Sequence, residues 1–152
     1  LTTVKYLSTS HYWLRLFYIY GPNQKDDSLI PHIIKNTLSG KEIILKSKNN
    51  LLDYLSVDEV AVVLKKFLYH KPTSGIYNVG SGKCIELVKI IKSIEKYFKT
   101  KIFIKYEKSK TKKLCFWSST KKIKKNVKWK PKITFTIGLK KTIKFYVKKY
   151  KN

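Results

Sequence analysis

An apolar run near the start of the chain ends abruptly at a turn. Residues 14–20 are mostly aliphatic, aromatic or β-branched, without clean alternation, and Gly21-Pro22 follows them directly. Such a run is typical of a strand that is covered on both faces, and a Gly-Pro pair stops it. Because ligands bind beyond the carboxyl ends of strands in open α/β sheets, we expect the loop after residue 20 to border a site.

Helical spacing of apolar residues recurs further along the chain. It predicts amphipathic helices over 29–39 and 57–69, and another over the apolar positions from Leu87 to Phe98. Ser28 is suited to cap the first helix, and Ser56 followed by Glu59 indicates a capping box for the second. Short apolar runs predict strands at 42–46 and 102–106. The core positions expected on the second helix are Val60, Val63, Leu64, Phe67 and Leu68.

The composition is strongly basic, with 34 Lys+Arg against 9 Asp+Glu and a net charge of +25 at pH 7. Such a charge ordinarily indicates a polyanion partner. However, Arg15 is the only arginine, and the abundance of Lys, Ile, Asn and Tyr is typical of an AT-rich genome. Nucleic-acid readers usually use arginine for bidentate contacts, so we do not expect nucleic acid to be the partner.

Two cysteines, Cys84 and Cys115, are too few for a disulfide framework and lack metal-ligand spacing. No apolar run approaches the roughly 20 residues that a membrane-spanning helix needs. We therefore expect free, buried or half-buried thiols, no membrane contact and a cytoplasmic location.

Several short motifs carry a resemblance to a known family. Residues 15–22 read R-L-F-Y-I-Y-G-P, which is similar to the R-x-F-N-x-Y-G-P pattern of the NAD-dependent epimerase/dehydratase family, the extended short-chain dehydrogenases that act on nucleotide sugars. Further matches follow in family order at Leu29-Ile30-Pro31, at 53–61, at 77–82, at Trp129-Lys130-Pro131 and at Gly138-Leu139. Together the matches extend over nearly the whole chain.

The resemblance implies an α/β fold class, namely the C-terminal part of an extended short-chain dehydrogenase Rossmann-like fold, with late parallel strands and a small α/β substrate-binding lobe. Residues 1–13 would be a remnant of the dinucleotide-binding half, and residues 14–152 would form the late strands and the lobe. The sequence contains no Met, no G-x-G-x-x-G or G-x-x-G-x-x-G loop, and no Tyr-x-x-x-Lys pair before Arg15. We therefore expect a fragment of a longer enzyme.

The whole enzyme, by this resemblance, would be an NAD(P)-dependent nucleotide-sugar epimerase or dehydratase and a homodimer. NAD or NADP would be bound mainly by the missing N-terminal half. The fragment would contribute nucleotide-sugar binding, and we assign it no catalytic, cofactor-binding or metal-ligating residue.

Two positions depart from the family pattern. Tyr18 replaces the family's asparagine, and Leu52 stands where an arginine normally clamps a substrate phosphate. Lys48 could supply that charge instead.

The basic loop at 108–113 corresponds to the family's R-P-G-D segment, in which an arginine binds the nucleotide diphosphate, and Lys110, or Lys108 if the register slips, is the candidate for that contact. A solvated charge run is an equal alternative for this loop. The substrate-binding residues that the resemblance implies are Tyr18, Asn23, Leu29, Ile30, Pro31, Leu52 and Lys110.

Three neighbouring polar residues have simpler explanations. Asp53 is expected to accept backbone hydrogen bonds at a turn. Asp58 and Glu59 lie in a first helical turn, where carboxylates complement the helix dipole, and we prefer this role to acid/base chemistry. His32 is expected to face solvent, with a contact to substrate phosphate as the lesser alternative.

Three alternatives to this function stay open. A degenerate, inactive homologue is compatible with Tyr18 and Leu52, and it would keep the fold without binding nucleotide sugars tightly. A basic nucleic-acid-binding module would bind with an affinity that falls steeply with salt. A structural or partner-binding lobe would bind neither ligand.

Overall fold

The computed structural model describes residues 10–46, 50–107 and 113–151. Its helices are α1 (Leu29–Leu38), α2 (Val57–His70), α3 (Leu87–Phe98), α4 (Lys121–Val127) and α5 (Phe135–Lys151). Its strands are β1 (Tyr12–Leu16), β2 (Tyr18–Tyr20), β3 (Ile43–Leu45), β4 (Leu51–Leu52), β5 (Tyr54–Ser56), β6 (Gly75–Val79), β7 (Ile85–Glu86), β8 (Ile104–Tyr106) and β9 (Cys115–Phe116).

The strands pair mostly in parallel. β1 pairs with β6, β2 with β5 and β3 with β8, all parallel, while β4 lies between antiparallel β7 and parallel β9. Parallel pairs need long crossover connections, and α1 and α2 lie within them. The expected α/β class is confirmed.

The predicted strand over residues 14–20 is two strands. The break falls at Phe17, whose N–H donates to the Val79 carbonyl at 3.1 Å, whereas the next N–H, that of Tyr18, donates to the Asp53 carbonyl at 3.0 Å. The chain therefore changes partner from β6 to β5 at this point.

The prediction that this strand is covered on both faces is wrong. Trp13, on one face of β1, is 56% exposed, and Leu16, at the end of the opposite face, is 49% exposed. Tyr12 and Leu14, which share the face of Leu16, pack against the cluster formed with α2 and α4. Within the described residues, helices therefore cover only part of one face.

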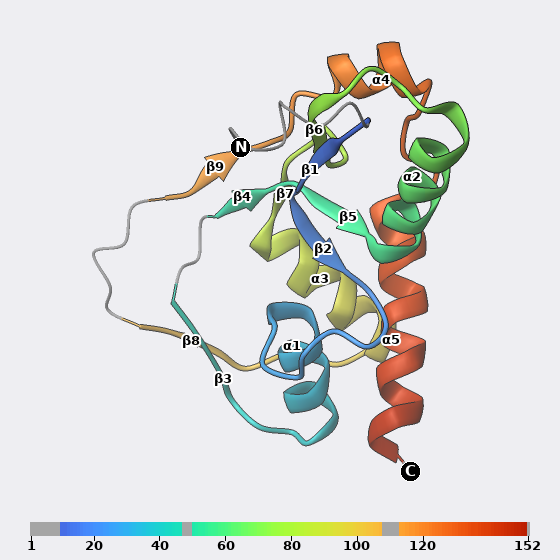
Figure 1. Ribbon diagram of the computed structural model, residues 1–152. Helices are drawn as coiled ribbons and strands as arrows, with labels where there is room; N and C mark the ends of the chain where they lie inside the picture. Colours follow the sequence, from blue (N-terminus) through green and yellow to red (C-terminus); the bar gives the residue numbers. More distant parts are fainter. Residues whose placement is uncertain (1–9, 47–49, 108–112, 152) are drawn as a thin grey trace.

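Two hydrophobic clusters form the core. The larger one joins α1, α3 and α5 with β3 and β4, and the smaller one joins α2 and α4 with β5 and β6. In Figure 1, α4 and α2 lie at the top, α1 lies at the bottom, and α5 runs along the right-hand side. The buried side chains of α5 include Leu139, Ile143 and Tyr146, as its sequence spacing predicts.

The predicted helices and strands are present with small shifts at their ends, but two details of α2 are wrong. Leu64 and Leu68 are 48% and 75% exposed, because α2 packs through the narrower stripe of Val60, Val63 and Phe67. The capping box does not form either, since Ser56 makes no side-chain cap hydrogen bond. Ser28 holds the N-cap position of α1, also without a side-chain bond.

The proposed boundary between residues 13 and 14 falls inside β1, and residues 1–9 lie outside the described residues. That division of the chain stays a prediction. Within the described ranges, no helix is both long enough and apolar enough to cross a membrane.

Candidate functional site

Two cavities adjoin at the start of α1. The inner cavity, of about 290 Å³, lies between β2, β5 and the loop before α1. The outer cavity, of about 450 Å³, lies between α1, β3, β4 and the start of α3. Leu29, Leu52 and Tyr54 line both cavities, so the two share a wall.

Four of the predicted substrate-binding residues meet in the inner cavity. Tyr18 of β2, Leu29 and Ile30 of α1, and Leu52 of β4 all line it. The strand pairing explains this convergence, because β2 pairs with β5 and β5 directly follows β4. Residues that are distant in sequence thereby reach one place.

Two other predicted residues, Asn23 and Pro31, do not line either cavity, and the third, Lys110, is not among the described residues. Asn23 is exposed in the loop after β2, at a φ of 61°, and Pro31 is buried in the first turn of α1. Lys110 lies outside the described residues, as do Lys48 and Lys108.

The amino end of α1 borders both cavities. Ser28 and Leu29 line the inner one, no acidic residue lies in the first turn, and no side chain caps the helix. The first N–H groups of a helix have no partner within the helix and attract negative charge. A phosphate placed here would therefore be attracted to the amino end of α1.

Gln24 is a cavity residue that sequence reasoning missed. Its Nε2 donates to the Ile19 carbonyl at 3.1 Å, while its Oε1 is buried and has no hydrogen-bond partner within the described part of the chain. Its position two residues after Gly21-Pro22 was the available signal.

Tyr54 was also missed, although it belongs to the 53–61 motif. Its ring lines both cavities and lies 5.7 Å, centroid to centroid, from that of Tyr18. Burial is the main reason that its pKa rises to about 12, with a smaller contribution from Tyr18. Burial likewise raises the pKa of Tyr20, with Asp58 adding to the effect. Both phenols therefore stay neutral. The Tyr20 hydroxyl donates to the Phe135 carbonyl at 3.2 Å, so Tyr20 offers the cavity mainly its ring.

Asp53 is turned away from these cavities and has a structural role. It is fully buried and accepts backbone N–H bonds from Ser81 at 2.7 Å, Gly82 at 3.0 Å and Ser118 at 2.9 Å. The hydroxyls of Ser81 and Ser118 donate to it as well, at 2.5 and 2.6 Å. The expected backbone-accepting role is confirmed, and we call this cluster the Asp53 junction.

The adjacent carboxylates of α2 point to different partners. Glu59 is buried and accepts from the N–H groups of Lys132 and Ile133, both at 2.6 Å, and from Trp129 Nε1 at 3.3 Å. Asp58 forms a surface ion pair with Lys141 at 2.7 Å. Each carboxylate has a structural partner, which fits the expected structural role.

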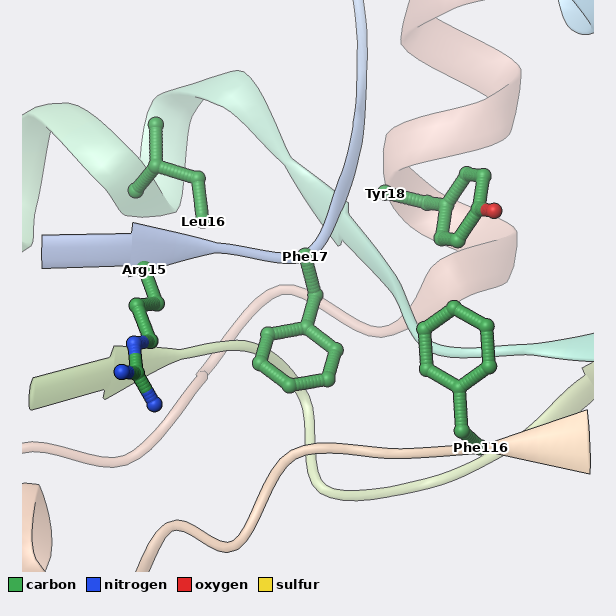
Figure 2. Close-up of a pocket in the computed structure, with 5 residues that line it drawn as sticks. All are labelled: Arg15, Leu16, Phe17, Tyr18 and Phe116. Atoms are coloured by element: carbon green, nitrogen blue, oxygen red, sulfur yellow. The ribbon is translucent and has the colours of Figure 1, made fainter.

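A third, more open depression of about 380 Å³ lies where β1 meets β2. Figure 2 shows Arg15 and Phe17 on one side of the strand and Leu16 on the other, with the ring of Tyr18 over that of Phe116. The Tyr18 and Phe116 centroids are 5.8 Å apart. Because Tyr18 also lines the inner cavity, it separates these two spaces.

No metal centre is evident in the described ranges, where no group of three or more His, Cys, Asp and Glu side chains could hold an ion. Cys84 and Cys115 are free thiols, as expected. Cys84 is half-buried, as a buried or half-buried thiol was predicted to be, but that prediction is wrong for Cys115, which is exposed.

Comparison with known proteins finds relatives that are named as enzymes of sugar nucleotides. CDP-abequose synthase of Salmonella muenchen is 32% identical over 85 residues, which are 55% of this chain and 29% of that protein. The dTDP-glucose 4,6-dehydratase of Escherichia coli is 25% identical over 140 residues, which are 84% of this chain and 38% of that protein. The chain thus spans less than half the length of these relatives.

Solved structures match the fold over nearly the whole chain. The dTDP-glucose 4,6-dehydratase of Bacillus anthracis, in complex with NAD, has a TM-score of 0.81 and 26% identity, covering 92% of this chain and 45% of that chain. The UDP-glucuronic acid 4-epimerase of Bacillus cereus, in complex with UDP-glucuronic acid and NAD, has a TM-score of 0.81 and 22% identity, covering 90% and 45%. The expected extended short-chain dehydrogenase fold is confirmed.

The match to the family itself covers residues 3–80, which is about half of the chain and includes β1, β2, α1, the shared wall of the two cavities and α2. The chain therefore belongs to the NAD dependent epimerase/dehydratase family.

Proposed function

We propose that this chain is the substrate-binding part of an NAD(P)-dependent nucleotide-sugar epimerase or dehydratase, and that the two adjoining cavities hold the nucleotide sugar. The observation that carries this proposal is the convergence of Tyr18, Leu29, Ile30 and Leu52 on the inner cavity.

The cavities suit the two halves of such a ligand. Apolar walls and neutral tyrosines, with few polar groups between them, are typical of small-molecule sites. The inner cavity offers Gln24 and the phenols of Tyr18 and Tyr54 to sugar hydroxyls, while the open amino end of α1 suits a diphosphate.

This sequence contains no glycine-rich loop that would bind NAD or NADP, the cofactor that supplies hydride-transfer chemistry when bound. Neither Gly-rich dinucleotide loop is present, and Gly80-Ser81-Gly82 is occupied by its bonds to Asp53. We therefore assign the cofactor mainly to the other part of a longer enzyme. A homodimer of that enzyme in the cytoplasm belongs to the same proposal.

Exposed apolar side chains on β1 support a larger assembly. Trp13 and Leu16 are about half exposed on opposite faces of the strand, and β1 has β6 as its strand partner in the described structure. Exposed apolar side chains beside a strand of this kind are typical of an interface. We propose that the cofactor-binding part of the enzyme covers them.

The decisive experiment is calorimetric titration of the chain with UDP-, dTDP-, CDP- and GDP-sugars in the presence of NAD. One class of nucleotide sugar is expected to bind. In the variant Leu29→Trp, the larger indole would project from the shared wall into the cavities. We expect the affinity for the nucleotide sugar to fall at least about tenfold.

Leu68→Trp is the matched control, because Leu68 is 75% exposed on α2, away from both cavities. It should bind like the unsubstituted chain. If no nucleotide sugar binds, or if Leu29→Trp binds as tightly as the control, the proposal is wrong. The alternative of an inactive homologue is then favoured.

A further inference from the structure

The outer cavity has a polar rim over an apolar floor. Four rim side chains, those of Asp27, His32, Lys46 and Asn50, come from the loop before α1, from α1 itself and from the ends of β3 and β4. The rest of the wall is formed by Leu29, Ile44, Leu45, Leu52, Tyr54 and Leu87.

Positive charge is confined to this rim. Among the described residues that line the two cavities, His32 and Lys46 are the ones that can carry a positive charge. The shared wall cannot supply one, because Leu52 is apolar and 6% exposed. An anionic ligand lying across both cavities would therefore find its counter-charge on the outer rim.

His32 has a defined place on this rim. Asn36, one turn later in α1, has its Nδ2 at 3.4 Å from the imidazole nitrogens, and that Nδ2 also donates to the His32 carbonyl at 2.9 Å. The histidine is half-buried and belongs to the helix whose amino end borders the cavity. Lys46 is exposed directly after β3, so it can reach the ligand as a flexible point charge.

We propose that His32 and Lys46 bind the diphosphate of the nucleotide sugar, as the charged contacts that Leu52 cannot make. This inference rests on the proposed function, since it names the residues that would hold the charged centre of that ligand. Asp27 stands on the same rim and opposes the anion, so the site depends on His32 and Lys46 together.

The test is a series of titrations with inorganic pyrophosphate, with the nucleoside alone, and with the nucleotide sugar, using the chain and the variants His32→Gln and Lys46→Ala. Each variant is expected to lose about tenfold in affinity for the diphosphate-containing ligands, as for a charge-assisted hydrogen bond. Affinity for the nucleoside should be unchanged. His32→Lys, which restores a cation, should recover most of the loss, which a merely structural role would not predict.

Matched controls exclude a general effect of the basic surface. His70→Gln at the end of α2 and Lys124→Ala on α4 remove the same groups at exposed positions outside the cavities. They should bind every ligand as the unsubstituted chain does. Equal losses in the controls, or no loss in His32→Gln and Lys46→Ala, would overturn the inference.

The outcomes also separate this inference from the proposed function. If nucleotide sugars bind and the two variants bind them equally well, the function stands and these two residues are the wrong ones. If pyrophosphate binds through His32 and Lys46 but no nucleotide sugar does, the anion site stands and the function fails. If neither ligand binds, both fail.

Discussion

Three consecutive residues, Leu52, Asp53 and Tyr54, belong to two regions with opposite properties. Leu52 and Tyr54 point into the two cavities, whereas Asp53 points the other way, into a junction where five hydrogen bonds meet its carboxylate. Alternation along an extended chain produces this division. In the junction, polar groups pair with one another, whereas in the inner cavity the Oε1 of Gln24 has no hydrogen-bond partner within the described part of the chain.

This difference separates stability from binding. Removal of a buried carboxylate that is surrounded by donors strongly destabilises a fold, because the donors are then left without an acceptor. A polar group on the rim of a cavity has solvent as its alternative, so its loss changes stability little. Substitutions in the junction should therefore change unfolding, and substitutions on the rim should change ligand affinity.

The largest effect is expected from Asp53→Asn. The amide NH₂ would face donors that now meet an oxygen, so the free energy of unfolding should fall by roughly 3–5 kcal/mol. Urea denaturation would show a lower midpoint at an unchanged slope. Asp58→Asn, on the surface of α2, is the control, and a loss below roughly 1 kcal/mol for Asp53→Asn would contradict the role of the junction.

Gly80→Ala tests the same junction without touching a charge. A Cβ at Gly80 would lie 2.7 Å from Asp53 Oδ2 and also press on the Ser118 hydroxyl, so the junction would have to open. Gly40→Ala cannot serve as the control, because Gly40 has a positive φ and alanine would be strained there. Ala61→Gly, on the exposed face of α2, is the control instead, since it also changes one methyl group, in the opposite direction. We expect Gly80→Ala to destabilise by more than the roughly 1 kcal/mol that a glycine in a helix costs.

A smaller loss in the free energy of unfolding is expected from Glu59→Gln. This variant tests whether a second buried carboxylate behaves as Asp53 does. Its Oε1 accepts two N–H bonds from residues 132 and 133, and a glutamine would keep an oxygen there, so its NH₂ would face the N–H of Trp129 that now donates to Oε2. Loss of the charge and of this bond should cost roughly 2–3 kcal/mol. Trp129 lies in this site, and its fluorescence would report the change. A variant as stable as the unsubstituted chain would show that the turn before α5 does not depend on Glu59.

Tyr54 gives a pH-dependent test at the boundary of the two regions. Its pKa in the folded chain is about 12, raised from an ordinary value of 10 by burial. The unfolded chain therefore loses the proton first, so this stabilisation is complete below pH 10 and is lost as the pH rises toward 12. Over that interval the loss attributable to Tyr54 should be roughly 2 kcal/mol.

The measurement is denaturant unfolding at several alkaline pH values for the chain and for Tyr54→Phe, which cannot ionise there. Tyr20, Tyr146 and Tyr150 also have raised pKa values, so the difference between the two proteins isolates the Tyr54 contribution. If both proteins lose stability in parallel, Tyr54 does not titrate as a buried phenol.

The contrast between junction and cavity also shows what the sequence could predict. The ends of α1, α2 and α3 follow from local apolar spacing, and the accepting role of Asp53 follows from its place beside a turn. Its partners could not be predicted, because Ser81 and Ser118 are 28 and 65 residues away in the chain. The break at Phe17 has the same origin, since it reflects a change of strand partner.

The cavity was predictable in part. Tyr18, Leu29, Ile30 and Leu52 were identified from short motifs, whereas Gln24, Lys46 and Tyr54 were not, because only the folded chain brings β3 and the loop before α1 to the same space. Leu64 and Leu68 show the opposite error. Their spacing is helical and apolar, but the width of the buried stripe depends on the partner surface.

The smallest effect on stability is expected from Asp27→Asn on the rim. Asp27 is exposed, so the free energy of unfolding should change by less than about 0.5 kcal/mol. Removing a negative charge beside His32 and Lys46 should nevertheless raise affinity for a nucleoside diphosphate by roughly two- to fivefold, and more at low salt than at high salt. Asp26→Asn is the comparison, because Asp26 is the neighbouring carboxylate, paired with Lys149 at 2.7 Å and absent from both cavity walls. A gain in Asp27→Asn alone would locate the bound anion at the rim, whereas equal gains in both variants would show only that this basic chain attracts anions over its whole surface.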